Sequence, residues 1–357
     1  YSHYSWGRSP FVLSPSFPMN KKWSDFIFSF GFMIVGVVFL FFGTLTAHTD
    51  SFKKIVAKWP GPAKSDIPVA GGDVAPNVLP VSRPAVPLSI NSASFNGQLT
   101  AGAAIVVDDK TNTVLFKKNI EEMRPLASIT KLITALVLND MPLNWSATAT
   151  VLAEDIESGN HVEEGEEYTL EDLWHIALIG SSNSAVKTLV RVSGLSAGEF
   201  VDQMNRKVAD LNLFSLHFTE PTGLESGNIG NALAAARLLK EAVKVERIFN
   251  TLQIGEYYAH PINQKPRRVW STNWLLTDWI SSNFSHDEIV GKTGYITEAG
   301  YNFVVRLADK NGHAIRVAIF GSSSNESRFT EARDLGQWVF ANFLWPDQEG
   351  FDTLFQK

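Results

Sequence analysis

The distribution of apolar and polar positions separates the start of the chain from the rest. Phe26 to Ala47 contains no charged residue and follows the basic pair Lys21 and Lys22. A run of about 20 apolar residues is long enough to cross a bilayer as a helix. Leu45 is too large for the small-residue rule of a signal-peptide cleavage site. We therefore expect an uncleaved single-pass transmembrane helix at 26–47, after an N-terminal segment, 1–25, on the cytoplasmic side.

A proline-rich stretch follows this apolar run. Prolines recur at positions 60, 62, 68, 76, 80, 84 and 87, with two glycines at 71 and 72. Such a composition buries little apolar surface and favours extended backbone. We expect a stiff stalk at 48–91, a globular domain at 92–345 and a short C-terminal tail at 346–357.

Periodicity changes several times within the globular domain. Apolar residues at 103–107 and 114–116 around a polar turn predict a β-hairpin, and 301–308 with 314–321 predicts a second strand pair. Helical spacing runs through 128–138, 170–192, 197–211, 232–245 and 328–343, and a Gly-Ser-Ser-Asn turn at 180–183 separates two helical runs within the second of these. Strands at both ends with helices between them predict a mixed α/β fold. We expect an antiparallel sheet flanked by helices, plus a mostly helical region.

Composition excludes several classes of function. The net charge of -6 provides no basic surface for nucleic acid. Cysteine is absent, which removes thiol nucleophiles, thiolate metal sites and the cysteine-dependent L,D-transpeptidases. The eight histidines include no His-Glu-x-x-His pair for a zinc peptidase. We expect neither a metal nor an organic cofactor.

Three short strings of residues suited to catalysis occur in order along the chain: Ser128-Ile-Thr-Lys131, Ser181-Ser-Asn183 and Lys292-Thr-Gly294. Ser-x-x-Lys also occurs at Ser51 and Ser184, but the first lies in the predicted stalk and the second has no suitable Ser-x-Asn after it. Each serine or asparagine alone is equally typical of a helix cap. The ordered set favours a site.

Ser128 has the better context for a nucleophile. It begins a predicted helix, where backbone N–H groups stabilise negative charge, and Lys131 shares its helix face. A serine hydroxyl needs a base to take its proton, and a lysine serves only if its pKa is lowered by burial or by a cation such as Lys292. Gly291-Lys292-Thr293 also ends like a phosphate-binding loop, but His286 occupies the position of the required first glycine.

These strings resemble those of the penicillin-recognising serine enzymes. The resemblance is closer to the low-molecular-weight D-alanyl-D-alanine carboxypeptidases and endopeptidases, and it spans roughly 102–343. It includes Pro125 to Ala135, the Phe218-Thr-Glu-Pro-Thr-Gly-Leu224 segment, and Gly291 to Tyr295 with Ala299-Gly-Tyr301. Two departures are Ser182, where the family often has glycine, and Asn231-Ala-Leu-Ala-Ala235, where it usually has a Ser-Thr-Ala string.

The resemblance implies a role for each site residue. Ser128 would attack the penultimate D-Ala carbonyl, Lys131 would accept its proton, and Ser181 would pass a proton to the leaving amine. Asn183 would bind the substrate amide and position Lys131. Backbone N–H groups of Ser128 and Tyr295 would form the oxyanion hole. The remaining implied contacts to the substrate carboxylate come from Lys292, Thr293, Gly294 and Arg328, although Arg328 is equally compatible with a surface ion pair to Glu326 or Glu331.

The implied function is a penicillin-sensitive serine DD-peptidase acting on peptidoglycan stem peptides. Its β-lactam inhibitors would bind covalently, and the catalytic domain would lie outside the bacterial cell membrane. A serine β-lactamase is one alternative, with Glu220 as its only suggestive second base. A non-catalytic wall-binding protein is another alternative. The presence of all motif residues argues against it. The sequence leaves carboxypeptidase and endopeptidase open, and the lack of a separate C-terminal β-domain favours the endopeptidase by analogy only.

Overall fold

The computed structural model describes residues 83–91, 94–157 and 161–356, which belong to one compact unit. The predicted transmembrane helix at 26–47, the N-terminal segment and most of the predicted stalk lie outside the described residues. Among the residues that are described, no helix is long and apolar enough to cross a membrane.

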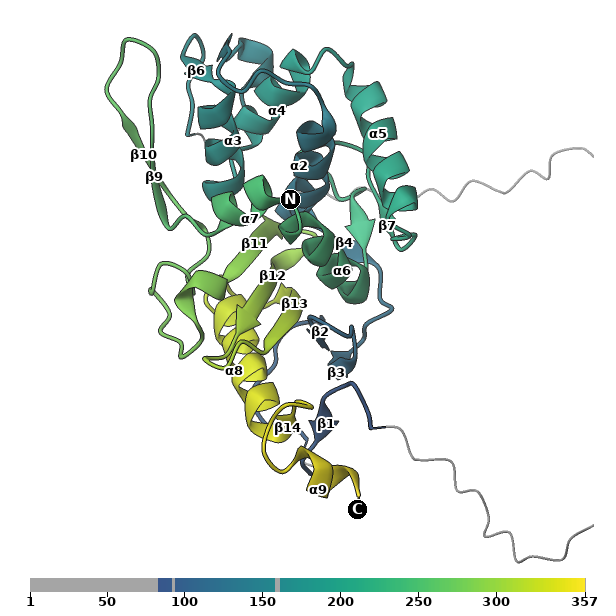
Figure 1. Cartoon of the computed structure of the whole chain (residues 1–357). Coiled ribbons are helices and arrows are strands. Elements are labelled where there is room, and N and C mark those ends of the chain that lie inside the picture. Colours follow the sequence, from purple (N-terminus) through teal and green to yellow (C-terminus); the bar gives the residue numbers. More distant parts are fainter. Residues whose placement is uncertain (1–82, 92–93, 158–160, 357) are drawn as a thin grey trace, which may run out of the picture. The chain divides into compact units, whose positions relative to one another are not determined.

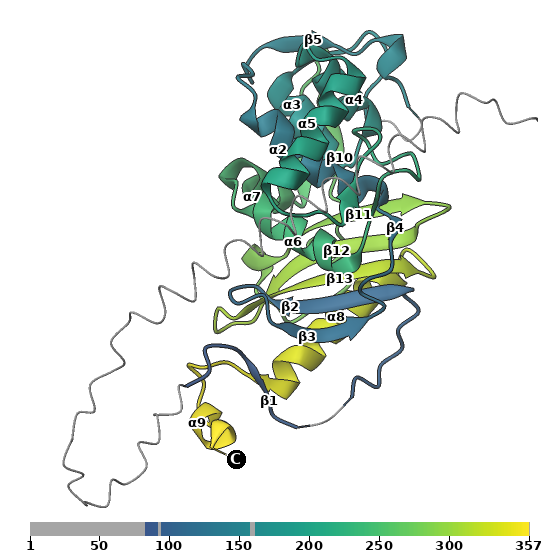
Figure 2. The ribbon, with the colours of Figure 1, turned by 90° about the vertical axis from the view of Figure 1, so that its right-hand side faces the viewer.

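A five-stranded antiparallel sheet forms the base of the fold (Figures 1 and 2). Its strand order is β11-β12-β13-β2-β3, so the first hairpin of the domain pairs with its last strands. Figure 2 shows β11 at the edge nearest the helical region. The predicted antiparallel sheet built from distant segments is confirmed. The strands are β2 (Ala103–Asp108), β3 (Val114–Lys118), β11 (Val290–Ile296), β12 (Gly300–Ala308) and β13 (Ala314–Ser322).

Both faces of this sheet are buried. Alternate residues of a strand point to opposite faces, so Ile105 joins the core under helix α6 (Ala232–Val243), whereas Val106 joins the core under helix α8 (Ser327–Asn342). All six residues of β2 are buried, which is typical of a strand covered by helices on both sides. The predicted closing helix at 328–343 is thus confirmed as the cover of one face.

The helical region surrounds α2 (Lys131–Asp140), whose first eight residues are all buried. A helix that is apolar on every side needs neighbours on every side. Its neighbours include α4 (Asn183–Val192), α5 (Ala197–Asp210) and α6. The predicted helical run 170–192 is divided at Gly180 into α3 (Leu170–Ile179) and α4. Helix α7 (Glu246–Leu252) packs against both α3 and α6.

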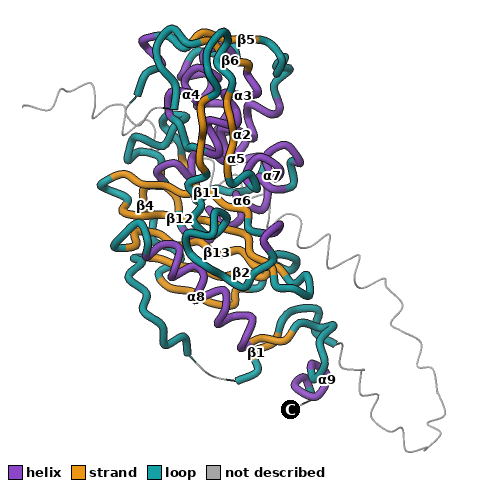
Figure 3. The backbone as a smooth tube through the Cα atoms, turned by 90° about the vertical axis from the view of Figure 1, so that its left-hand side faces the viewer, coloured by secondary structure: helices purple, strands orange, loops and turns teal. Residues whose placement is uncertain are grey.

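Shorter elements connect these layers. Figure 3 shows the β9–β10 hairpin alongside α3. Strands β4, β7 and β8 form a small sheet, and β5 pairs with β6. Their bounds, with the short helices, are β4 (Arg124–Pro125), η1 (Ala127–Thr130), β5 (Thr148–Thr150), η2 (Ala153–Asp155), β6 (Glu167–Thr169), β7 (Leu216–His217), β8 (Ile229–Gly230), β9 (Glu256–Ala259), β10 (Arg267–Trp270) and η3 (His286–Glu288).

The two ends of the described chain lie against each other. β1 (Leu88–Ser89) pairs with β14 (Phe343–Leu344), and Arg83 forms an ion pair with Asp352 at 2.6 Å, in helix α9 (Phe351–Phe355). Residues 83–89 of the predicted stalk therefore lie against C-terminal residues 343–352, which include part of the predicted tail.

Candidate active site

Ser128 follows a strained backbone turn. Ala127 has φ +50°, a left-handed conformation that a residue with a Cβ rarely adopts. Two glycines from distant segments close on this turn. A Cβ at Gly223 would lie 2.0 Å from the Ala127 carbonyl oxygen, and a Cβ at Gly294 would lie 2.8 Å from that of Leu126. The missing side chains let both segments touch the backbone that presents Ser128.

Lys131 is fully buried beside Ser128. Its Nζ donates to Ser128 Oγ at 2.9 Å, to Asn183 Oδ1 at 2.5 Å and to the Thr222 carbonyl at 2.7 Å. Burial lowers the pKa of Lys131 to about 7, and the negative charge of Glu220 raises it in part. The pKa is thus lowered by burial, one of the two causes expected from the sequence, so a large fraction of the amine is neutral near pH 7 and able to accept a proton.

A second serine–lysine pair lies on the other side of the site. Lys292, which is 1% exposed, donates from Nζ to Ser181 Oγ at 2.8 Å and to the Thr293 carbonyl at 3.1 Å. Burial holds the pKa of Lys292 well below its ordinary value, and the charges of Lys131 and Arg328 add to this. Ser181 has φ +60°, in the turn before α4. The three sequence strings therefore converge on two linked serine–lysine pairs.

The remaining residues of the Lys-Thr-Gly-Tyr string follow edge strand β11. Thr293 is buried and donates from Oγ1 to Thr272 Oγ1 at 2.7 Å. Tyr295 is 50% exposed and stacks on Tyr301 of the neighbouring strand, with ring centroids 4.4 Å apart. Gly294 lies between them, against the nucleophile turn. This strand brings its backbone next to Ser128.

Arg328 lies behind this strand and is only 7% exposed. One nitrogen donates to the Gly294 carbonyl at 3.1 Å and to the Asn302 carbonyl at 3.3 Å, and another donates to Asn325 Oδ1. The guanidinium also packs over the Phe329 ring, 4.8 Å from its centroid. Burial lowers the pKa of Arg328 to about 10, so it carries a positive charge at neutral pH.

The alternative interpretation of Arg328 as a surface ion pair is wrong. Among the described residues, Arg328 forms no salt bridge with Glu326 or Glu331. Glu331 instead accepts hydrogen bonds from Thr100 and from Ser322, the latter at 2.7 Å. Helix α8 turns Arg328 inward toward the sheet, where a cation lies close to the site.

Two buried asparagines that sequence reasoning missed connect the nucleophile segment to its surroundings. The Asn228 carbonyl accepts from Leu126 N at 2.8 Å, and its side chain donates to Thr130 Oγ1 at 3.1 Å. Asn302 donates from Nδ2 to the Pro125 carbonyl at 2.9 Å. Asn228 belongs to one of several Ser-x-Asn strings, a signal too common to select it. Nothing in the sequence distinguished Asn302.

The arrangement is suited to acyl transfer without a metal. Ser128 has a buried amine as base, Ser181 has a second lysine beside it, and the backbone of Gly294 on β11 lies next to Ser128. Within the described ranges, no group of three or more histidine, aspartate or glutamate side chains is placed to hold a metal ion. Two serines and two lysines are thus brought together from three separate parts of the chain.

Several known proteins are similar to this chain in sequence. The D-alanyl-D-alanine carboxypeptidase family profile matches residues 89–323. A D-alanyl-D-alanine endopeptidase of Haemophilus influenzae is 30% identical over 284 residues, which cover 72% of this chain and 93% of the relative. D-alanyl-D-alanine carboxypeptidase DacF of Bacillus subtilis is 28% identical over 254 residues, covering 68% of this chain and 63% of the relative.

Solved structures agree on the fold. The Streptomyces K15 DD-transpeptidase superimposes with a TM-score of 0.61 at 21% identity, over 70% of this chain and all of that one. An evolved putative penicillin-binding protein homolog from Mycobacterium tuberculosis gives a TM-score of 0.64 at 24% identity, over 73% and 97%. The match of the family profile to most of the domain shows that this chain belongs to the D-alanyl-D-alanine carboxypeptidase family, as a serine-type DD-peptidase of the low-molecular-weight penicillin-binding class.

Proposed function

We propose that Ser128 forms an acyl-enzyme with the penultimate D-Ala of peptidoglycan stem peptides. Neutral Lys131 accepts the Ser128 proton as Oγ attacks the carbonyl carbon. Backbone N–H groups of Ser128 and Tyr295 stabilise the developing oxyanion, a contribution of about 3–4 kcal/mol for each donor in related chemistry. The observation that carries this proposal is the buried Lys131 amine, 2.9 Å from Ser128 Oγ and with its pKa lowered to about 7.

The second serine–lysine pair completes the reaction. The leaving amine takes a proton from Ser181, which recovers it through Lys292, 2.8 Å away. Water then attacks the Ser128 ester and gives a proton through Ser181 to Lys292, while protonated Lys131 returns its proton to the Ser128 oxygen and the peptide acid is released. Arg328 provides positive charge on the side of β11, where the substrate carboxylate would bind, and Lys292 Nζ provides hydrogen-bond donors there. Asn183, already bonded to Lys131, has its amide N–H groups available for the substrate amide.

We further propose that the preferred bond is a cross-link between two stem peptides. Support comes from the relatives named as endopeptidases in Haemophilus influenzae, Pseudomonas aeruginosa and Escherichia coli, which are 30%, 26% and 25% identical. Purified protein is incubated with a cross-linked muropeptide dimer and, separately, with a monomer ending in D-Ala-D-Ala. Faster cleavage of the dimer supports the proposal, and release of D-Ala from the monomer alone contradicts it.

The site also predicts a long-lived adduct with benzylpenicillin. A β-lactam leaving group stays tethered and blocks water, so fast hydrolysis needs a further base. Glu220 is not free for this role, because its carboxylate accepts from Thr222, Gly223 and Asn228. Mass spectrometry should place the adduct on Ser128 and find it stable for minutes. Rapid clearance by the wild type, with trapping by Glu220→Gln, would establish a β-lactamase instead.

Location is a separate proposal. Residues 26–47 anchor the protein in the bacterial cell membrane, with the catalytic domain on the extracytoplasmic side. The support is the uncharged run of Phe26 to Ala47 and the poor cleavage site at Leu45. The protein should remain in the membrane fraction in high salt. A soluble form that begins near His48 would show that the segment is a signal peptide.

A further inference from the structure

The Glu220 carboxylate is enclosed by donors of its own loop, residues 220–228. Oε2 accepts from Thr222 N at 2.6 Å and from Thr222 Oγ1 at 2.5 Å. Oε1 accepts from Gly223 N at 2.5 Å and from Asn228 Nδ2 at 2.7 Å. Bonds to an ionised acceptor are stronger than neutral ones. A single side chain therefore fixes the backbone of this loop at two consecutive residues.

This loop supplies one of the three groups around the Lys131 amine. A neutral amine has two N–H bonds and one lone pair. With one N–H on Asn183 Oδ1 and the other on the Thr222 carbonyl, the lone pair is left facing Ser128 Oγ. The position of the Thr222 carbonyl thus decides whether the neutral amine presents its lone pair to the proton that it must accept.

Both packing and polar contacts hold the loop in this position, since Thr222 is 1% exposed and Gly223 touches the turn at Ala127. Pro221 and Leu224 line a cavity of about 460 Å³, shared with Val190 of α4 and Leu195. Gly223 has φ +90° and no side chain to pack. Several polar contacts fix the loop beside this space, among them the bond from Thr134 Oγ1 to the Pro221 carbonyl at 2.6 Å. Glu220 makes four of them.

We propose that Glu220 is a positioning residue of the acyl-transfer reaction, which fixes the Thr222 carbonyl against Lys131 and places a negative charge near the Lys131 amine. This inference rests on the proposed function only for the identity of the physiological substrate. The carboxylate touches neither Ser128 nor the substrate side of the site. Its effect reaches the reaction through the amine.

Charge and geometry have separable consequences. Glu220 raises the pKa of Lys131 against the larger effect of burial, so its neutralisation should lower that pKa further. Acylation needs the neutral Lys131 amine. The acid limb of the pH–rate profile of acylation should therefore move to lower pH by about one unit, as expected for a nearby charge in a partly screened site. The amide of Gln has a single acceptor oxygen, so two donors of the loop lose their partner. The plateau rate should fall about tenfold, comparable to the loss of one charge-assisted hydrogen bond.

The experiment measures the second-order rate of acylation by benzylpenicillin from pH 5 to 9 for the wild type, Glu220→Gln and Glu220→Asp. Asp keeps the negative charge on a shorter side chain. The acid limb of the Glu220→Asp profile should therefore stay close to that of the wild type, while the plateau rate of acylation falls. Glu225→Gln is the matched control, because Glu225 is exposed on the same loop and its carboxylate accepts a long hydrogen bond from Thr219 Oγ1, at 3.5 Å. Its limb and plateau should equal those of the wild type.

An unmoved limb in Glu220→Gln overturns the inference, whatever happens to the plateau, because a loosened loop slows acylation equally at every pH. If Glu220→Gln fails to fold, an unchanged plateau in Glu220→Asp overturns it. NMR titration of ¹³C-labelled lysine, with Lys131 assigned by Lys131→Arg, measures the same pKa without catalysis. A wild type that fails to cleave D-Ala peptides would disprove the proposed function and leave this titration intact.

Discussion

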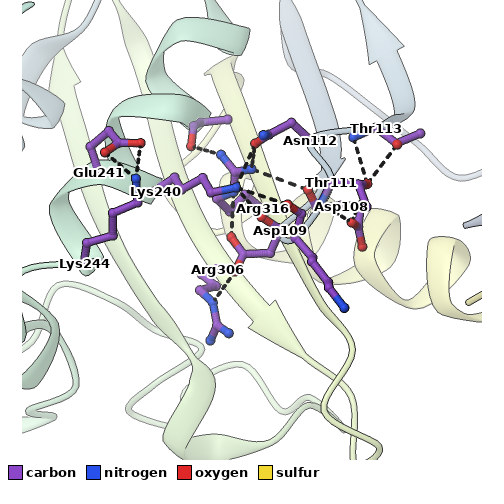
Figure 4. A network of polar contacts seen from close by, with 12 residues as sticks. Asp108, Asp109, Thr111, Asn112, Thr113, Lys240, Glu241, Lys244, Arg306 and Arg316 are labelled. Carbon is purple, nitrogen blue, oxygen red and sulfur yellow. Dashed lines mark hydrogen bonds and ion pairs between the residues drawn. The ribbon is translucent and has the colours of Figure 1, made fainter. Parts of the chain in front are cut away.

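Two regions of this molecule bury a basic side chain, and they compensate the loss of its hydration differently. Under helix α6, Arg316 is 0% exposed and lies 2.7 Å from Asp109 Oδ1 (Figure 4). It also donates to the Ala236 carbonyl at 2.7 Å and to Asn112 Oδ1 at 2.6 Å. In the active site Lys131 is equally buried, but all three of its acceptors are neutral groups. One cation is paired with a carboxylate and the other is not.

The difference separates a structural charge from a reactive one. Arg316 and Asp109 join strand β13 to the turn of the β2–β3 hairpin, where Lys240 also donates to the Asp109 carbonyl at 2.6 Å (Figure 4). Arg306 of strand β12 pairs with the other oxygen of Asp109 at 3.1 Å, so this carboxylate balances two cations of the sheet. Lys131 instead resides where desolvation favours its neutral form, at a cost to stability. Active sites commonly trade stability for such a group.

The largest expected effect is on catalysis. Lys131→Met removes the only base near Ser128 Oγ among the described residues and should slow acylation by about 10²–10⁴-fold. The same change removes a buried, partly charged amine, so the midpoint of thermal unfolding should rise. Acylation by labelled penicillin and calorimetry measure the two effects. A lower midpoint would show that Lys131 stabilises the fold and that the contrast with Arg316 is wrong.

The opposite result is expected at the structural charge. Arg316→Met removes the donors to the Ala236 carbonyl and to Asn112 and leaves Asp109 with Arg306 alone, and should lower the free energy of unfolding by about 1–3 kcal/mol. Acylation of the protein that remains folded should be unchanged, because Arg316 lies under α6 and not beside Ser128. Urea unfolding gives the stability. In the double variant Arg316→Met/Asp109→Leu the loss of stability should be smaller than the sum of the two single losses, and full additivity would contradict the pairing argument.

The contrast is also visible in the pH dependence of stability. The pKa of Lys131 is about 7 in the folded chain and 10.5 as the reference value, so the unfolded chain binds more protons between these limits. Wild-type stability should therefore gain relative to Lys131→Met as pH rises from 7 to 10.5. The difference in free energy of unfolding between Lys131→Met and the wild type should narrow by a few kcal/mol over this range. A gap that stays constant over this window would mean that the pKa is not lowered.

A smaller effect tests the backbone that holds the reactive pair. Gly223→Ala introduces a Cβ 2.0 Å from the Ala127 carbonyl oxygen, and should displace the turn before Ser128. We expect acylation to fall and stability to drop by about 1–3 kcal/mol. Gly194→Ala is the matched control, with φ +82° and no atom within 4 Å of the added Cβ. It should lose a similar backbone-strain energy and keep its acylation rate.

Local pattern was enough to predict most elements and the principal site. The hairpin at 103–116, the strand pair at 301–321 and the helices at 197–211, 232–245 and 328–343 agree with the structure within a few residues. Their signals are periodicities of apolar residues, which each segment carries by itself. The order of Ser128-x-x-Lys, Ser181-x-Asn and Lys292-Thr-Gly likewise needs no coordinates. The break in the helical run 170–192 was predicted from the turn residues Gly-Ser-Ser-Asn at 180–183, and the structure confirms it between α3 and α4.

Tertiary structure decided what depends on partners far away in the chain. The sequence could not say whether Arg328 faces Glu326 and Glu331 or the sheet, since a helix places such residues near one another and packing selects the direction. It gave Glu220 as a possible water-activating base, whereas the fold surrounds its carboxylate with Thr222, Gly223 and Asn228. Residue types and their order name the reactive groups. Burial and long-range hydrogen bonds, which sum over the whole fold, set their charge and orientation.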